Sequence, residues 1–176
     1  METERIDEII QNISGGDLKS FQELYRSYAG VVRGVLFKMV PSNQIDDLVQ
    51  EAFVKIWKGL PGFKGESGLK VWIYRIAYRV AVDFLRKGNS RSSQELGEDL
   101  PAESGESPVL EKNLVRGLLQ TFDPDHRTVL VLYFMEECSL QEIAQIVDVP
   151  LGTVKSRLFY AKQKLREALK KKGVIL

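Results

Sequence analysis

The stretch SLQEIAQIVDVPLGTVKSRLFYAKQKLREALKKK (Ser139–Lys172) decides the fold of the C-terminal part of this chain. Its first third has apolar residues spaced as on one face of a helix: Leu140, Ile143, Ala144 and Val147. Ser139 is expected to cap this helix, and Glu142, three residues on, to complete a capping box. Pro150 ends it, because proline cannot extend a helix and keeps Val149 out of helical geometry. A short helix, a tight turn and a long second helix predict a helix-turn-helix, whose second helix can enter the DNA major groove.

The second helix of this motif has two distinct faces. We expect the apolar residues to pack inward: Val154, Leu158, Ala161, Leu165 and Leu169. The opposite face carries Ser156, Phe159, Tyr160 and Gln163. Basic residues flank that face, with Lys155, Lys162 and Arg166 on one side and Arg157 and Lys164 on the other. Phosphates line both sides of a DNA groove, so this pattern favours DNA binding; an ordinary surface helix with solvated charges is the alternative.

Length, composition and charge narrow the classes of protein. At 176 residues and 44% hydrophobic, the chain can form one domain or two small helical ones. A net charge of +1 excludes a polycation that coats nucleic acid indiscriminately. The single cysteine, Cys138, excludes an internal disulfide and suits a reducing cytoplasm. We see neither a signal peptide nor an apolar run long enough to span a bilayer, so we expect a soluble cytoplasmic protein without direct membrane insertion.

Residues 88–108 divide the chain. They are rich in Gly, Ser, Glu and Pro and break every apolar period, which predicts a flexible acidic linker. The linker is a passive tether or, alternatively, an acidic strand that lies in a basic channel of a partner. No period-two alternation is long enough for a sheet. We therefore predict an all-α protein of two small helical domains, residues 1–87 and 109–176.

Apolar periods place the other helices. Asp17 is expected to cap a helix from Leu18, followed by a second helix over Val31–Val40. The third, about Gln44–Leu60, buries Ile45, Leu48, Val49, Ala52, Phe53, Ile56 and Trp57. The fourth, about Leu69–Arg86, buries Leu69, Trp72, Ile73, Ile76, Ala77, Val80 and Phe84. In the second domain we expect a helix from Val109 and another, capped by Asp125, over His126–Met135, with Val129, Leu130, Leu132, Tyr133 and Phe134 largely buried.

Two outward helix faces carry side chains suited to binding. On the third helix, Asp47, Gln50, Glu51, Val54 and Lys58 lie opposite the buried stripe. On the fourth, Arg75, Arg79 and Arg86 form a column with Tyr74 and Tyr78 beside it. Arginines next to exposed aromatic rings can hold unstacked bases, the cation on the phosphate and the ring on the base. The alternative is that both tyrosines pack beneath neighbouring helices and the arginines are solvated.

Nothing in the chain has the spacing of a catalytic or metal site. His126 is the only histidine and Cys138 the only cysteine, and neither stands in a metal-ligand or triad-like pattern. The Gly15-Gly16 pair is not followed by the Lys-Ser/Thr of a phosphate-binding loop. We therefore expect no enzymatic activity, no cofactor and no metal.

Four stretches together resemble the extracytoplasmic-function (ECF) sigma factors of bacterial RNA polymerase, in the sigma-70 superfamily. They are FQELYRSYAGVVRGVL (Phe21–Leu36), DDLVQEAFVKIWKGL (Asp46–Leu60), FKGESGLKVWIYRIAYRVAVDFLRK (Phe63–Lys87) and the C-terminal stretch quoted above. They stand in the order and spacing of that family, with a variable acidic linker between them. The resemblance implies a sigma factor that binds core polymerase and directs transcription initiation by reading the −10 and −35 promoter elements.

The resemblance also implies partners and residues. The clamp helices of the largest polymerase subunit would bind Asp47, Gln50, Glu51 and Val54, and the flap of the second-largest subunit would contact the C-terminal domain. The single-stranded −10 element would meet Lys64, Ser67, Arg75, Tyr78, Arg79 and Asp83. The duplex −35 element would meet Thr153, Lys155, Ser156, Arg157, Phe159, Tyr160 and Lys162. Family members are usually held inactive by an anti-sigma factor, often membrane-bound.

Three positions depart from the family pattern. Arg79 stands where the family very often has Asn, near the captured −10 base. Glu137 stands where a Gly usually ends the helix before the helix-turn-helix. Cys138 occupies a usually aliphatic position, which indicates a small buried hydrophobe; a redox sensor is the alternative.

A stand-alone transcription regulator, a helical sensor with a DNA-binding tail, is the alternative function. It would account for the C-terminal half equally well. It would not account for the acidic face at Asp47 and Glu51 or for the arginine column on the fourth helix.

Overall fold

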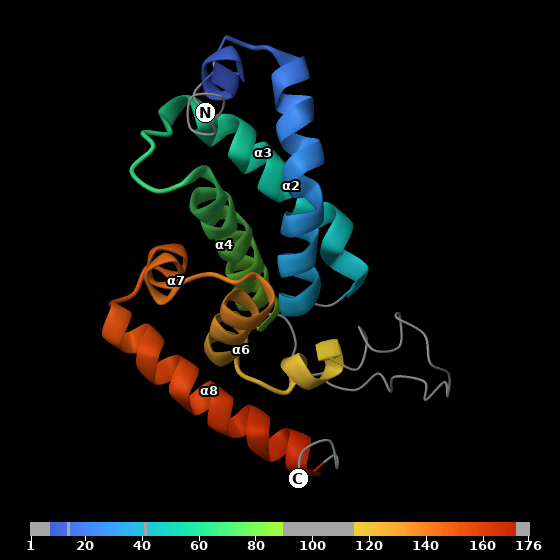
Figure 1. Ribbon diagram of the computed structural model, residues 1–176. Coiled ribbons are helices and arrows are strands. Elements are labelled where there is room, and N and C mark those ends of the chain that lie inside the picture. The colour runs from blue at the N-terminus through green and yellow to red at the C-terminus, as the bar shows by residue number, and fades with distance from the viewer. Residues whose placement is uncertain (1–7, 14, 41, 90–114, 172–176) are drawn as a thin grey trace. The chain divides into compact units, whose positions relative to one another are not determined.

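The computed structural model describes residues 8–13, 15–40, 42–89 and 115–171, and the chain divides into two compact units. The first comprises residues up to Ala81 with Gln145–Asp148, and the second Val82–Ala144 with the residues from Val149 onward. Within the described ranges every regular element is helical, which confirms the all-α prediction (Figure 1). Most of the predicted linker (residues 90–108), and Val109 of the helix expected after it, lie outside the described residues.

Helix α2 spans Leu18–Met39 and begins at the predicted cap. The Asp17 carboxylate accepts hydrogen bonds from the backbone N–H groups of Lys19 and Ser20, both at 3.1 Å, and from Ser20 Oγ at 2.6 Å. These hydrogen bonds lower the pKa of Asp17, and the bond from the Ser20 hydroxyl has the largest effect. The prediction of two helices between Leu18 and Val40 was wrong. Gly30 lies inside one continuous helix, where glycine costs about 1 kcal/mol but does not remove a backbone donor as proline does.

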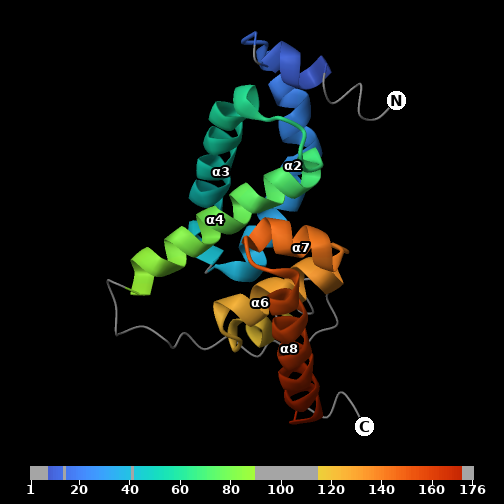
Figure 2. The same cartoon turned by 90° about the vertical axis from the view of Figure 1, so that its left-hand side faces the viewer.

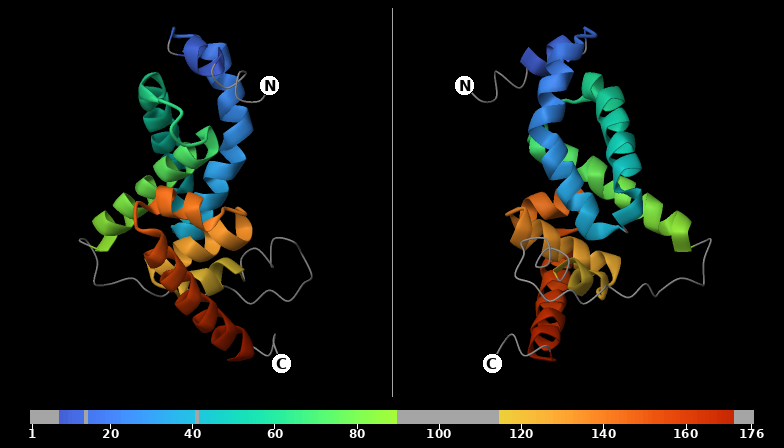
Figure 3. Two further views of the ribbon diagram at one scale, coloured as in Figure 1. Left: turned by 60° about the vertical axis from the view of Figure 1, so that its left-hand side comes forward. Right: turned by 90° about the vertical axis from the view of Figure 1, so that its right-hand side faces the viewer.

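Helix α3, Ile45–Gly59, packs against α2, and the two helices lie side by side in Figure 3. Aromatic side chains form the contact between them. The ring of Phe21 lies edge-on to Trp57 at 4.7 Å between centroids and to Phe53 at 6.3 Å. Tyr25 covers Phe53 at 4.5 Å. The predicted buried stripe of α3 is confirmed, with Trp57 half-buried and the following residues buried: Ile45, Leu48, Val49, Ala52, Phe53 and Ile56.

A 3-10 turn, Leu60–Gly62, and the loop of residues 63–68 connect α3 to α4, Leu69–Asn89. The predicted end of α4 at Arg86 falls three residues short, so the helix includes the first two residues of the expected linker. Trp72 on α4 contacts Phe63 with the two rings tilted by 53° and 5.2 Å between their centroids, and it also packs against Gly59. A β-carbon on Gly59 would lie 2.9 Å from the Trp72 ring, so glycine permits this close approach.

In the second unit, residues 115–120 are helical and precede α6, Pro124–Leu130. The cap of α6 is Asp123, whose carboxylate accepts a hydrogen bond from the His126 N–H at 3.1 Å, so the prediction of Asp125 as the cap was wrong. Pro124 is the reason: its fixed φ suits the first helical position, where no N–H is needed. The helix therefore starts two residues earlier than expected.

A π-helical turn, Val131–Met135, continues α6 and changes which side chains it buries. Val129, Leu130 and Leu132 are buried as predicted, but Phe134 is 52% exposed and Tyr133 half-buried. The wider turn rotates the side chains away from the positions that a regular helical period gives them. The prediction that Phe134 is buried was therefore wrong.

Glu137 ends this segment in the left-handed conformation, with φ of 53°. The Cys138 N–H then bonds to the Leu132 carbonyl at 2.9 Å and closes the turn. A glycine at this position would adopt the same conformation at lower cost. Cys138 is 4% exposed, which confirms the prediction of a small buried hydrophobe.

The helix-turn-helix is formed by α7, Leu140–Val147, and α8, Leu151–Lys171. The predicted capping box is confirmed: the Ser139 N–H donates to the Glu142 carboxylate at 2.7 Å, and the Glu142 N–H donates to Ser139 Oγ at 3.2 Å. Asp148 takes a φ of 59°, and the Val149 N–H bonds to the Ala144 carbonyl at 3.2 Å. This is a Schellman closure, which turns the chain sharply into Pro150 and α8.

Candidate nucleic-acid interface

The recognition helix α8 has the predicted inner and outer faces. Val154, Leu158 and Ala161 are buried, and Leu165 and Leu169 are half-buried. The outer face exposes Lys155, Ser156 and Gln163 together with two large rings, Phe159 at 58% and Tyr160 at 56%. Phe159 and Tyr160 lie edge to face, 5.5 Å between centroids. Exposed aromatic rings beside a hydroxyl and an ammonium group offer both apolar and hydrogen-bonding contacts to base edges.

Three other predicted −35 residues lie at the edges of this outer face. Thr153 is half-buried, and its carbonyl accepts a hydrogen bond from Ser156 Oγ at 3.0 Å. The ammonium group of Lys162 sits over the rings of Tyr133 and Phe134, 4.6 and 5.3 Å from their centroids. The guanidinium of Arg157 is paired with Asp125. The seven predicted residues thus lie along one helix, but two of their cations already have intramolecular partners.

The predicted −10 residues lie on α4 and on the loop before it. Lys64 is exposed and Ser67 half-buried in the loop of residues 63–68, which turns through Gly65 at φ of 73°. Along α4, Arg75 and Tyr78 are half-buried, whereas Arg79 and Asp83 are exposed. The tilted contact between the rings of Phe63 and Trp72 anchors the loop to the same helix. Loop and helix therefore present these polar groups on one supported scaffold.

Tyr74 is buried and does not belong to an exposed aromatic platform, which agrees, for this residue, with the alternative that the tyrosines pack beneath neighbouring helices. Its side chain is 2% exposed, and the Lys70 ammonium lies over its ring at 5.6 Å. Most of the surface of a tyrosine ring is apolar, so the buried state of the ring is lower in free energy than the solvated state. Tyr78, one turn on, stays half-buried and retains its place among the candidate residues.

The predicted polymerase-docking residues form one exposed face of α3. Asp47, Gln50, Glu51 and Val54 are all exposed, Val54 at 51%. Glu51 pairs with Lys55 at 2.8 Å, which holds its carboxylate along the helix surface. An apolar side chain within an acidic and amide rim is typical of a protein-binding surface.

Neither a membrane span nor a metal cluster is found in the part of the chain that the structure describes. There, no helix is both long and apolar enough to cross a bilayer. Within the same residues, no three His, Cys, Asp or Glu side chains gather in a group that could hold a metal ion.

The sequence alone did not reveal the contacts between α6 and α8, which pack against each other (Figure 2). Asp123 and Asp125 at the start of α6 meet Lys164 and Arg157 of α8. The seven-residue separation of Arg157 and Lys164 was the available signal, because it puts both side chains on one side of the helix. The positions of their acidic partners follow from the cap at Asp123, which the periodicity misplaced.

Comparison with known proteins agrees with this geometry. Residues 24–91 match the family model of Sigma-70 region 2, and residues 118–167 match that of Sigma-70 region 4. The ECF RNA polymerase sigma-E factor of Haemophilus influenzae is 32% identical over 92% of this chain and 93% of its own length. That of Escherichia coli K12 is 31% identical over 88% of this chain and 89% of its own.

The chain belongs to the ECF family of RNA polymerase sigma factors. As a sigma factor it binds core RNA polymerase and directs promoter-specific transcription initiation. Region 2 includes α3 and α4, and region 4 includes α6, the π-helical turn and the helix-turn-helix.

Two solved structures share the sigma-factor fold. CnrH, solved in complex with the cytosolic domain of CnrY, aligns with a TM-score of 0.71 at 23% identity, over 93% of this chain and 96% of that one. The sigma factor RpoE of Bartonella quintana, solved with the anti-sigma factor NepR, aligns with a TM-score of 0.72 at 24% identity, over 87% of this chain and 98% of that one.

Proposed function

We propose that this sigma factor reads a two-part promoter, with region 4 on the duplex −35 element and region 2 on the single-stranded −10 element. The observation that carries the proposal is the outer face of α8, where Lys155, Ser156, Phe159 and Tyr160 are exposed on a helix presented by a capped and sharply turned partner. Such a helix fits the major groove, and its lysine can contact a flanking phosphate.

Region 2 supplies the second half of promoter recognition. The loop with Lys64 and Ser67 and the α4 residues Arg75, Tyr78 and Arg79 would hold the −10 strand, with Asp83 near them. A cation on a phosphate and a ring beneath a base need no duplex, so these groups act on DNA that has opened. Arg79 can donate to base edges or phosphates where many relatives carry the shorter Asn, and the −10 preference should differ accordingly.

The α3 face of Asp47, Gln50, Glu51 and Val54 would bind the clamp helices of the largest polymerase subunit. Its carboxylates favour a basic partner and the exposed Val54 an apolar contact at the centre. Region 4 would contact the flap of the second-largest subunit. The protein contributes specificity and strand capture and no catalysis of its own, since polymerase performs the chemistry.

Control by an anti-sigma factor completes the proposal. One of the sigma factors that share this fold was solved with an anti-sigma factor bound. We expect the free protein to be cytoplasmic and to be held inactive by an anti-sigma factor, which in this family is often membrane-bound. The predicted domain limits, residues 1–87 and 109–176 with the acidic linker of 88–108, are retained in this proposal.

The direct test is transcription with purified core polymerase on fragmented genomic DNA, with the 5′ ends of the transcripts mapped. Added protein should create a set of new start sites that share two sequence elements upstream, one near −10 and one near −35. A duplex-binding activity without core, and no new start sites with it, would instead support a stand-alone regulator. Once a start site is known, scrambling either element should abolish the transcript.

A further inference from the structure

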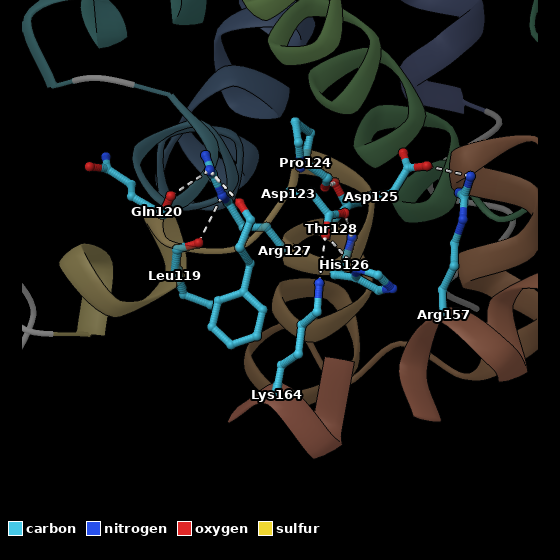
Figure 4. Close-up of polar contacts among 11 residues, drawn as sticks. Leu119, Gln120, Asp123, Pro124, Asp125, His126, Arg127, Thr128, Arg157 and Lys164 are labelled. Carbon is cyan, nitrogen blue, oxygen red and sulfur yellow. Dashed lines mark hydrogen bonds and ion pairs between the residues drawn. The ribbon is translucent and has the colours of Figure 1, made fainter. Parts of the chain in front are cut away.

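The start of α6 holds two cations of the recognition helix (Figure 4). The Asp125 carboxylate lies 2.5 Å from the Arg157 guanidinium, and the Asp123 carboxylate lies 3.4 Å from the Lys164 ammonium. Arg157 and Lys164 are seven residues apart, so they project from the same side of α8 about two turns apart. The two pairs therefore fix both the rotation of α8 about its axis and its position along α6.

The acidic end of these pairs is itself firmly held. Asp123 is the cap of α6, and its carboxylate also lies 2.5 Å from His126 Nδ1. Arg127, 8% exposed, donates from Nε to the Leu119 carbonyl at 2.9 Å and from Nη2 to the carbonyls of Gln120 and Phe122 at 3.1 and 2.9 Å. These bonds tie the start of α6 to the end of the preceding helix. The Asp123 carboxylate and the backbone that carries Asp125 are thus held in place, although the Asp125 side chain itself is 51% exposed.

The other flank of α8 is held in a different way. Lys162 lies over the rings of Tyr133 and Phe134 from the π-helical turn. Cation–π contacts of this kind add attraction without neutralising the charge. The recognition helix is consequently held on one side by carboxylates and on the other by aromatic rings.

Arg157 differs from the other cations near the outer face. Its side chain is 24% exposed and committed to Asp125. Lys155 and Arg166 are exposed, and neither has an ion-pair partner among residues 8–13, 15–40, 42–89 and 115–171. A guanidinium whose charge is already paired with a carboxylate gains less from a phosphate than a solvated cation does, and if it leaves that carboxylate it loses the ion pair. Lys155 has no such cost.

We propose that Arg157 is a positioning residue for −35 recognition: it sets the angle of α8 through Asp125 and makes no phosphate contact. This inference rests on the proposed function of α8 and assigns Asp125, an acidic residue that sequence reasoning misread as a helix cap, to the same task. It changes the role of a residue that its position on the helix and the family resemblance both put among the DNA contacts.

The test is the affinity of reconstituted holoenzyme for a mapped promoter, measured by fluorescence anisotropy at several salt concentrations. Lys155→Gln is the matched control and should reduce the slope of log K against log salt by about 0.9, the value for one phosphate contact. Arg157→Gln should weaken binding three- to tenfold and leave the slope at its wild-type value. Arg157→Lys, which keeps the pairing charge, should recover most of the loss.

The sign of the effect of Asp125→Asn separates the two roles of Arg157. If Arg157 is a positioning residue held by Asp125, then Asp125→Asn should weaken promoter binding by a factor similar to that of Arg157→Gln. The double variant should then bind the promoter no more weakly than either single variant. If Arg157 instead contacts phosphate, removal of its competing carboxylate should tighten binding. Tighter binding by Asp125→Asn, or a reduced slope for Arg157→Gln, would overturn the inference and leave the proposed function intact. A wild-type holoenzyme without promoter preference would overturn both.

Discussion

The ring of Trp72 occupies the space that a side chain on Gly59 would need: a β-carbon there would lie 2.9 Å from Trp72 Cζ2 and 3.2 Å from Cη2. The indole joins the end of α3 to α4 and supports the loop that is expected to meet the −10 strand. Its own neighbour in that loop is Phe63.

Gly59→Ala should destabilise region 2 by about 1–3 kcal/mol, because the methyl group displaces a ring that packs against two elements. Chemical denaturation followed by tryptophan fluorescence measures the change. Gly30→Ala is the matched control: nothing lies within 4 Å of its added carbon, and the higher helix propensity of alanine should stabilise α2 by about 1 kcal/mol. Equal effects from the two substitutions would contradict the role given to Trp72.

The double substitution Asp47→Lys with Glu51→Lys should abolish core binding and preserve the helical fold. It reverses two exposed charges on the proposed docking face, and like charges opposed across an interface cost several kcal/mol. Native mass spectrometry or size-exclusion chromatography with core polymerase measures binding, and circular dichroism the fold. Glu23→Lys, an exposed acid on α2, is the control and should bind core normally. Unchanged core affinity of the double variant would remove α3 from the interface.

Lys155→Ala with Ser156→Ala should impair −35-dependent initiation and spare core binding. Each lost contact to a base edge or its phosphate is expected to cost about 1–3 kcal/mol of promoter affinity. The measurement is initiation from the mapped promoter and from a copy with a scrambled −35 element. The variant should lose activity on the first and little on the second; Lys170→Ala, at the far end of α8, should resemble wild type on both.

Glu137→Gly should stabilise region 4 by about 1 kcal/mol. Glu137 holds φ of 53°, a conformation that costs a residue with a β-carbon about 1–2 kcal/mol and glycine almost nothing, while the freer unfolded chain of the glycine variant returns part of the gain. Thermal unfolding of wild type and variant measures the difference. Glu136→Gly is the neighbouring control, and at φ of −109° it should not stabilise the protein. A lower melting temperature for Glu137→Gly would contradict the expectation.

The stability that Asp123 provides should disappear between pH 4 and pH 2. Burial raises the pKa of Asp123, but hydrogen bonds from His126 and Lys164 and the His126 charge outweigh it and lower the pKa from 3.8 to about 2. A lowered folded-state pKa stabilises the native state above the unfolded pKa, and that gain is lost as pH falls through the folded one. Because the side chain is 45% exposed, solvent screening limits the gain to about 1 kcal/mol.

Asp123→Asn isolates this charge, since asparagine also caps helices well. At pH 6 the free energy of unfolding of the wild type should exceed that of the variant by about 1 kcal/mol, and in urea titrations this difference should narrow below pH 4 and close towards pH 2. A gap that stays constant with pH would mean that the carboxylate charge does not contribute.

Sequence periodicity placed helices over the described residues from Leu18 onward, and most of their buried faces, because most core-facing residues there obey the 3.6-residue period. It did not predict the helix of residues 8–13. It failed where the chain leaves that period. Phe134 is exposed because it lies within a π-helical turn, and α6 starts at Pro124 because proline stabilises a first helical position. The stretch from Leu18 to Val40 was divided into two helices, whereas the structure has one helix there that includes Gly30.

Some features of the candidate site could likewise be predicted from the sequence, and others could not. Outward positions such as Lys155 and Glu51 follow from helix geometry alone, and the structure exposes them. The pairing of Arg157 with Asp125 could not be predicted, since it joins residues 32 apart in the sequence through the packing of α8 on α6. Tyr74 and Arg75 are adjacent on α4, yet Tyr74 is buried and Arg75 only half-buried. Helix geometry gives the direction of a side chain, but it does not show which neighbouring elements cover it.

Both tryptophans of the chain, Trp57 and Trp72, belong to region 2, where one meets Phe21 and the other Gly59 and Phe63. Intrinsic indole emission is consequently blind to region 4 and reports one half of the protein only. Circular dichroism sees the helices of both halves. A comparison of the two signals therefore shows, without any added label, whether regions 2 and 4 unfold together or independently.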